Sequence, residues 1–230
     1  MVKAPPKDPK KTLKRIKIFG FLSKFFTISG VVLIIIALGP FIQQEVFYYI
    51  SRIKNQEFLL SDSAHPNETV PDSPFARLVS TKPIALEPVN RDFALVIEKI
   101  GVNVPVVKDV TVTDPKAYMQ ALETGVAHAI ISSYPSREPG NVYLFAHASL
   151  NFWRLGKYAT VFNLLRHLKE GDAIHLFYEN QEFVYKVVGV ERYKGFDVYP
   201  ITRPVLEPLL TLQTCDPPGT TLNRLVVTAK

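Results

Sequence analysis

The chain begins with a basic segment, and one long apolar run follows it. Phe25–Gln44 contains 20 residues and no charged side chain. At ~1.5 Å per residue, a helix of this length is ~30 Å long, enough to cross a bilayer. A buried core helix is rarely apolar on all sides over such a length. A cleaved signal peptide is disfavoured, because Pro40 would directly follow the cleavage site Ala37-Leu38-Gly39.

The flanks of this run predict its orientation. Residues 1–24 hold eight Lys or Arg residues and one Asp, so they are expected to form a disordered basic tail on the cytoplasmic side. Phe41, Phe47, Tyr48 and Tyr49 follow the run, as an interfacial aromatic belt would. The sequence therefore predicts a single-pass signal-anchor over 25–44 in the lipid bilayer, with the remainder of the chain outside the cytoplasm.

Residues 45–90 have the composition of a stalk. Prolines recur from Pro66 to Pro88, and no period of 2 or 3.6 is sustained. Such a stretch acts as a semi-stiff spacer. Asp72–Phe75 could fold back as a lid over a cleft, although a solvated stalk is the favoured interpretation. His65 lies in this stalk and is not expected to be functional.

From residue 91 to 230 the pattern changes to short apolar segments separated by turn residues. Two hairpins are predicted, one with its turn at Gly101 and one with its turn at Glu179–Gln181. Two short helices are expected, one capped by Asp114 and one over Val161–Leu168. About eight short strands remain, which indicates a mainly β fold, a closed antiparallel or mixed barrel.

Charge and cysteine content exclude several classes of function. The net charge is +6, but the basic tail supplies it, since residues 25–230 hold 19 basic and 20 acidic residues. No basic stripe is left for phosphates, so no nucleic-acid partner is expected. A single cysteine, Cys215, excludes an internal disulfide and a cysteine zinc site. The acidic residues show no calcium-ligand spacing, so neither a metal nor a cofactor is predicted.

Cys215 is the candidate nucleophile. It ends the strand-like segment Thr211–Cys215, and Pro217-Pro218-Gly219 follows shortly after it. A thiol at a strand end is held by the sheet and open to a loop-built cleft. A lone cysteine is more often a small buried hydrophobic residue. However, a free thiol outside the cytoplasm is unusual enough to suggest reactivity.

A nucleophilic thiol needs a base, and five histidines are available. His167 is expected on the surface, and His175 alternates with apolar residues inside a strand. His128 and His147 remain. His147 directly follows the apolar strand Asn141–Ala146, but periodicity alone hardly separates these two.

Arg224 is the candidate cation, nine residues after Cys215. On a neighbouring strand at ~4.8 Å its guanidinium could reach over the thiol. A fixed cation there would stabilise an oxyanion or bind the substrate carbonyl. Spacing alone favours an ordinary surface arginine.

Thr211-Leu-Gln-Thr-Cys215 with Arg224-Leu-Val-Val resembles the signature of the sortases, membrane-anchored cysteine transpeptidases of bacterial surfaces. Ile100–Val107, Pro139–His147 and Phe162–Asp172 follow in the order of that family, and the resemblance covers about 93–230. It implies the closed eight-stranded sortase β-barrel. It also implies that His147, Cys215 and Arg224 are catalytic, with Thr214 and Asp216 beside the thiol contacting the substrate or the oxyanion.

The resemblance also implies a reaction. Cys215 would cleave an LPXTG-like C-terminal sorting signal between Thr and Gly and form a thioester. An amine on a cell-wall precursor or on another surface protein would then accept the substrate. Ala146-His147-Ala148 departs from the Gly-His-Arg or Gly-His-Thr common in the family. No second apolar span follows Arg224, which disfavours the pilin-assembling type and favours a class D/E-like sortase.

The chain has two rival functional interpretations. The first is an inactive membrane-anchored barrel that binds peptide or glycan, with Cys215 buried and resistant to alkylation. The second, an L,D-transpeptidase, is excluded, because that class has a compact Ser-His-Gly-Cys motif and here 68 residues separate His147 from Cys215.

Overall fold

A computed structural model of the chain describes residues 9–54, 56–61, 83–111, 113–148 and 158–230. His65 and the suggested lid Asp72–Phe75 lie outside the described residues. The chain divides into two compact units, Met1–Pro40 and Phe41–Lys230.

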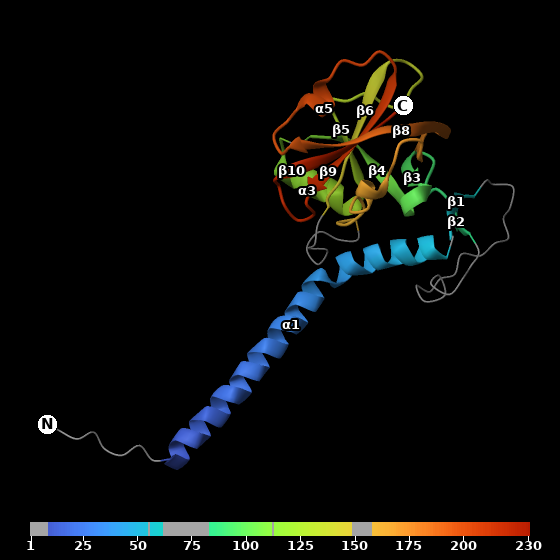
Figure 1. The fold of residues 1–230 in the computed structure, drawn as a ribbon. Helices are drawn as coiled ribbons and strands as arrows, with labels where there is room; N and C mark the ends of the chain where they lie inside the picture. The colour runs from blue at the N-terminus through green and yellow to red at the C-terminus, as the bar shows by residue number, and fades with distance from the viewer. Residues whose placement is uncertain (1–8, 55, 62–82, 112, 149–157) are drawn as a thin grey trace. The chain divides into compact units, whose positions relative to one another are not determined.

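The first helix, α1, runs from Pro9 to Ile53 and is longer at both ends than the predicted span (Figure 1). It contains Phe19–Ile36, an apolar window long enough to cross a membrane, in which no residue is buried inside the protein. Residues expected to be an irregular tail or stalk, 9–24 and 45–53, are therefore helical. Lys and Leu in 9–24 favour a helix, and no proline interrupts 45–53.

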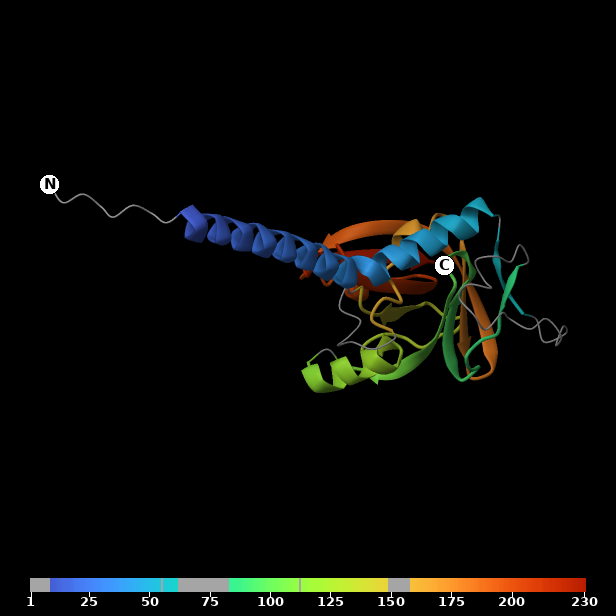
Figure 2. The same cartoon turned by 90° about the horizontal axis from the view of Figure 1, so that it is seen from below.

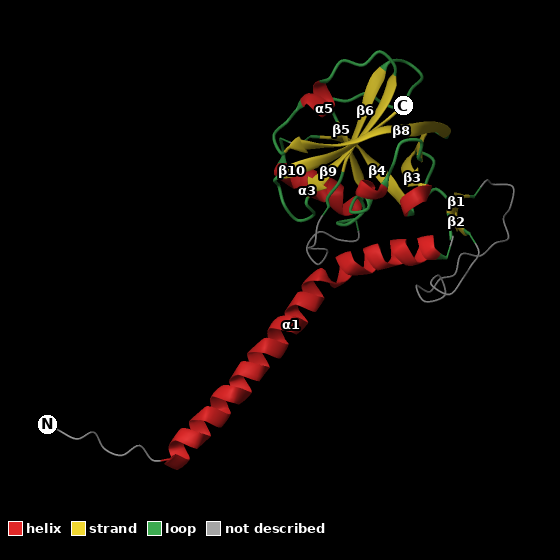
Figure 3. Cartoon of the chain, viewed as in Figure 1, coloured by secondary structure: helices red, strands yellow, loops and turns green. Residues whose placement is uncertain are grey.

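The second unit is a closed barrel of eight strands in the order β10-β8-β7-β3-β4-β5-β6-β9 (Figure 3). The predicted mainly β, closed mixed barrel is confirmed, because β4–β5 and β6–β9 pair in parallel while the other neighbours are antiparallel. The strands are β3 (Phe93–Ile97), β4 (Val102–Val110), β5 (Val126–Ala129), β6 (Gly140–Phe145), β7 (Ala173–Tyr178), β8 (Gln181–Lys194), β9 (Pro208–Asp216) and β10 (Asn223–Ala229).

A two-stranded parallel arm, β1 (Phe58–Leu60) with β2 (Ile84–Leu86), covers the outside of the barrel at β3. Phe93, Leu95 and Ile97 point into the main core. Ala94 and Val96 point the other way and pack against Leu60 and Leu86 of the arm. This double burial explains why β3 is apolar at every position instead of alternating.

Local signals predicted several elements correctly. The β7–β8 hairpin turns at Glu179 and Asn180, whose φ values are 49° and 64°, in the left-handed region that tight hairpin turns require. Helix α3 (Pro115–Thr124) begins at Asp114, whose carboxylate accepts hydrogen bonds from the backbone of Lys116 and Ala117. In Figures 1 and 2, α3 lies against the outside of the barrel.

The second predicted helix is wrong in type. Within Val161–Leu168 the structure has turns and a short 3-10 helix, η2 (Leu165–His167). The buried apolar residues are Phe162, Leu165 and Leu168, three positions apart. This spacing matches the three residues per turn of a 3-10 helix and not the 3.6 residues per turn of the predicted α-helix.

The expectation that His167 is a surface residue is also wrong. Its ring stacks on Tyr48 at 4.3 Å, and its Nε2 lies 3.0 Å from a carboxylate oxygen of Glu45. Glu45 also pairs with Arg166. The last turns of α1, inside the second unit, therefore pack on the β6–β7 connection, a long-range contact that no local pattern predicts.

Candidate active site

Three neighbouring strands, β6, β9 and β10, bring the predicted site residues together. Antiparallel pairing of β9 with β10 sets Cys215 directly opposite Arg224. Parallel pairing of β6 with β9 sets Phe145 opposite Gln213, and His147 and Cys215 each follow two residues later. Paired residues share a face of a sheet at ~4.8 Å spacing. Continued by two residues, this register puts His147, Cys215 and Arg224 in one row.

The pairing does continue past the end of β6. The Ala146 backbone N–H donates to the Gln213 carbonyl at 3.2 Å, and the Thr214 hydroxyl donates to the Ala146 carbonyl at 2.8 Å. Beyond Cys215, the Gly219 N–H donates to the Ala148 carbonyl at 2.7 Å. Hydrogen bonds thus join the two segments both before and after His147 and Cys215.

Thr214 and Asp216, predicted to contact substrate or oxyanion, flank the thiol. Thr214 is buried, and its hydroxyl proton is used in the bond to Ala146, so its side chain joins the two strands. One Asp216 carboxylate oxygen accepts a hydrogen bond from Arg192 Nε at 2.7 Å. Both side chains therefore already have protein partners, and their contact with substrate stays a prediction.

Cys215 is a free, partly exposed thiol, as a nucleophile must be. The imidazole of His147 is partly buried, and this desolvation lowers its pKa. Its Nε2 is buried and has no hydrogen-bond partner among the described residues. No hydrogen bond joins the imidazole to the sulfur here. Catalytic contacts are often loose before substrate binds, so this geometry is compatible with a base that engages later.

Arg224 is positioned by backbone carbonyls. Its Nη1 donates to the carbonyls of Asn223 at 3.1 Å and Thr221 at 3.4 Å. No carboxylate forms an ion pair with it in the described parts of the chain. No carboxylate among the described residues therefore competes with a substrate oxygen for the guanidinium opposite Cys215.

His128, the alternative base, lies elsewhere. It pairs with Leu144 across β5 and β6, its side chain is fully buried, and its Nε2 contacts the Ser133 carbonyl and the Ser132 hydroxyl at 3.1 Å. Burial lowers its pKa, while the bond to Ser133 and nearby Asp109 act in the opposite direction. His128 is thus a core residue bonded through Nε2, while its buried Nδ1 lies 3.6 Å from an Asp109 carboxylate oxygen. His175 is also satisfied, bonding Glu182 at 2.7 Å, as the sequence suggested.

The sequence did not single out one aromatic residue of this region. Tyr118 lies on α3, the helix that the Asp114 cap predicts. Its ring lies 6.1 Å from the His147 ring, centroid to centroid. Its contact with His147 joins a helix and a strand end that are not neighbours in sequence, so no local pattern could have predicted it.

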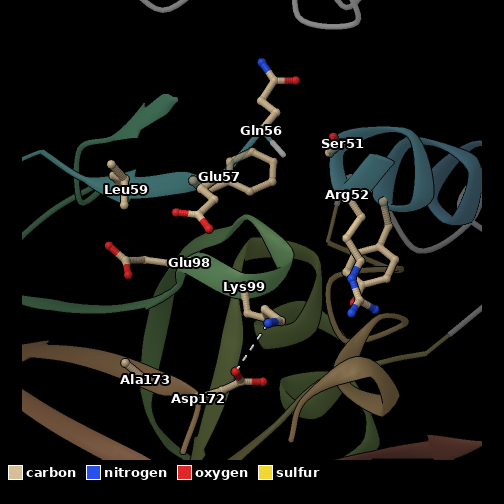
Figure 4. A pocket seen from close by; sticks show the side chains of 11 residues that line it. Ser51, Arg52, Gln56, Glu57, Leu59, Glu98, Lys99, Asp172 and Ala173 are labelled. Carbon is tan, nitrogen blue, oxygen red and sulfur yellow. Dashed lines mark ion pairs between the residues drawn. The ribbon is translucent and has the colours of Figure 1, made fainter. Parts of the chain in front are cut away.

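A separate cavity of about 370 Å³ lies between the end of α1, β1 and the 3-10 helix η1 (Glu98–Ile100). Its lining includes Ser51, Arg52 and Glu57, and Lys99 pairs there with Asp172 at 3.6 Å (Figure 4). None of the predicted site residues lines it. Among the described residues no group of three His, Cys, Asp or Glu side chains could hold a metal ion.

A family model, the Sortase domain, matches residues 95–230, which include the whole row of His147, Cys215 and Arg224. The chain belongs to the sortase family. A search among curated proteins finds no match. Among solved structures, this sortase is similar to sortase C-1 from Actinomyces oris, with 29% identity, a TM-score of 0.51, and coverage of 61% of this chain and 73% of that one.

Two further sortase structures match over more of the chain. Sortase C of Streptococcus pneumoniae has 21% identity and a TM-score of 0.51, covering 81% of this sortase and 86% of that chain. Sortase C1 of GBS pilus island 1 has 19% identity and a TM-score of 0.50, covering 82% and 80%. At these identities the likeness shows the fold. The class D/E-like assignment stays a prediction, although these neighbours are sortases C.

Proposed function

We propose that this sortase cleaves an LPXTG-like C-terminal sorting signal between Thr and Gly through a thioester on Cys215. The observation that carries the proposal is the strand register, in which the sulfur has the His147 position on one side and Arg224 on the other. These are the three groups that acyl transfer by a thiol requires: nucleophile, proton carrier and a cation for the oxyanion.

The proposed reaction has two steps. His147 takes the proton of the Cys215 thiol, the thiolate attacks the Thr carbonyl carbon, and Arg224 stabilises the negative oxygen that forms. The C–N bond then breaks, the electron pair leaves with the glycine nitrogen, and protonated His147 gives that nitrogen its proton. In the second step an amine attacks the thioester, His147 takes a proton from it, and the thiolate leaves. Water can replace the amine, which gives hydrolysis.

The proposed setting is the outer face of the cell membrane. The apolar window of α1 would span the bilayer with the basic N-terminus in the cytoplasm, because cations concentrate on that side. The amine would belong to a cell-wall precursor or to another surface protein. A protease added outside intact cells should then remove a C-terminal tag and leave an N-terminal tag intact.

The test of the reaction uses the full-length protein in detergent micelles. It is mixed with LPXTG and LAXTG peptides, and the mass of the protein is measured. We expect an added mass equal to the peptide up to Thr, on Cys215, which disappears when a glycine amine is supplied. Cys215→Ala is the control and should show no adduct. Absence of an adduct with every peptide, together with a thiol that resists alkylation, would instead favour a non-enzymatic binding module.

A further inference from the structure

Helix α3 carries an aromatic residue to the active site and is held firmly at both ends. Its start is fixed by the Asp114 cap, and the Tyr118 N–H donates to the Asp114 carbonyl at 2.9 Å. At its end, a side chain at Gly125 would lie 2.3 Å from the Pro105 carbonyl oxygen, so the helix meets β4 without space for a Cβ. Ala121 is buried on the same face as Tyr118.

The ring of Tyr118 contacts the end of the strand that leads to the base. It stacks on Phe145, with centroids 5.5 Å apart and planes 10° apart. It also meets the His147 imidazole edge to face, at 6.1 Å and 87°. Phe145 and His147 are two residues apart and share a face of the strand. One aromatic ring therefore packs against both.

The phenol end of the same side chain senses the charges of the other two site residues. Burial raises the pKa of Tyr118, charge on Cys215 raises it further, and Arg224 lowers it. These effects agree with the ring contacts in placing Tyr118 in the same region of the protein as the row.

Among the described residues, no hydrogen-bond acceptor orients the imidazole. In many catalytic sites a carboxylate or carbonyl accepts a hydrogen bond from the histidine and fixes its ring. No such partner of either ring nitrogen of His147 lies in the described part of this chain, and its buried Nε2 is unpartnered there. Packing can also orient a ring, and the contact with Tyr118 supplies packing of this kind.

We propose that Tyr118 is a positioning residue, whose ring holds the His147 imidazole in the orientation that serves Cys215. This inference rests on the proposed function for its catalytic meaning, but the contact itself can be tested without turnover. The ring limits rotation about the His147 side chain and keeps water from one side of the imidazole. The hydroxyl group is not required for either effect.

The test compares Tyr118→Phe, which keeps the ring, with Tyr118→Ala and Tyr118→Leu, which remove it. The His147 pKa is measured by NMR on full-length protein in micelles with ¹³C-labelled histidine, in a Cys215→Ala background. Because desolvation lowers this pKa, we expect Tyr118→Ala and Tyr118→Leu to raise it by about 0.5 or more, and Tyr118→Phe to leave it unchanged. Tyr134→Ala is the matched control, since that ring stacks on His128 and should alter only that residue's titration.

With Cys215 restored, kcat for peptide turnover should fall about tenfold or more in Tyr118→Ala, with a smaller change in KM and near wild-type rates in Tyr118→Phe. An unchanged His147 pKa in both ring-deleted variants would overturn the proposal. So would a loss of activity in Tyr118→Phe as large as in Tyr118→Ala. A protein that never acylates would refute the proposed function, while the NMR comparison would still report on the contact.

Discussion

A single residue, Arg224, combines a fixed charge with a fixed position. Its guanidinium bonds to the carbonyls of Asn223 and Thr221 and stands opposite Cys215. A planar fork held in this way can point an N–H at an oxyanion, whereas an ammonium group on a flexible stem cannot hold the same geometry.

We therefore expect Arg224→Lys to lower kcat by about 10²–10³-fold although the charge is kept. Steady-state cleavage of an LPXTG peptide by the full-length protein measures this. Arg192→Lys on the adjacent strand is the control and should stay within about threefold, because that side chain is mostly exposed and pairs with Asp216. An equally active Arg224→Lys would show that charge alone suffices.

For His147, the expected effect of removal is specific to proton transfer. His147→Ala should lower kcat/KM about 10²-fold or more, the usual cost of losing a general acid or base. The rate of Cys215 alkylation at pH 7 should fall too if the imidazole assists ionisation of the thiol. His128→Asn serves as comparison, since His128 contacts Ser132 and Ser133 rather than the site. A larger loss of activity in that variant would reverse the assignment of the base.

At the residue scale the sequence could propose the thiol but could not choose its base. His128 and His147 both follow apolar stretches, so periodicity treats them alike. Strand register separates them, because it places His147 beside Cys215, which is 68 positions later in the sequence. Only the resemblance to the sortase family predicted His147 as the base. Tyr118 was missed for the same reason, since the residues on a helix face do not indicate which strand end the helix packs against.

At the element scale, the last turns of α1 are clamped to the β6–β7 connection. Gln44 bonds Thr160 and Asn163, and Glu45 bonds Arg166 and His167. Glu45 and both of its partners are largely shielded from solvent. An ion pair in such a place is costly to break by removing one partner, since the remaining charge is left without compensation.

Glu45→Ala should therefore loosen this contact by about 1–3 kcal/mol. Hydrogen exchange of the full-length protein in micelles should become faster in residues 158–168 and in the last turns of α1, and stay unchanged in the β7–β8 hairpin. Glu57→Ala, which removes an exposed carboxylate further along the chain, is the control. Identical exchange in the two variants would mean that the clamp contributes little.

Elements with local signals were predictable and elements fixed by distant partners were not. The cap at Asp114 and the turn at Glu179–Asn180 act within a few residues, so composition reveals them. The extension of α1 to Ile53 and the 3-10 helix at Leu165–His167 depend on packing between segments over 100 residues apart. Residues 45–53 belong to the predicted stalk together with the prolines that begin at Pro66. The composition of the whole stretch therefore did not indicate that its first residues are helical.

At the scale of the whole molecule, the buried His128 and the partly buried His147 make stability depend on pH. Desolvation lowers the pKa of both His128 and His147 in the folded state. The unfolded chain takes up protons on these residues near pH ~6.5, where the folded protein does not. Unfolding then binds protons, so stability falls as the pH drops through ~6.5 towards the folded-state pKa values, and it is unaffected well above pH ~6.5.

We expect the melting temperature in micelles to decrease between pH 7.5 and 5.5, and to decrease less in the double variant His128→Asn/His147→Asn. Each histidine contributes at most about 1.4 kcal/mol per pH unit. The two proteins are compared by the change of their melting temperature with pH, so a uniformly lower stability of the variant does not affect the comparison. Parallel slopes in both proteins would assign the acid sensitivity to other groups.

The residues of the row are synthesised one after another. Strand β10 closes the barrel between β8 and β9 and carries Arg224. Ribosomes release His147 first, Cys215 much later and Arg224 last. A nascent chain that still lacks β10 carries the thiol without the guanidinium opposite it. The proposed site is therefore complete only after the final strand has inserted into the barrel.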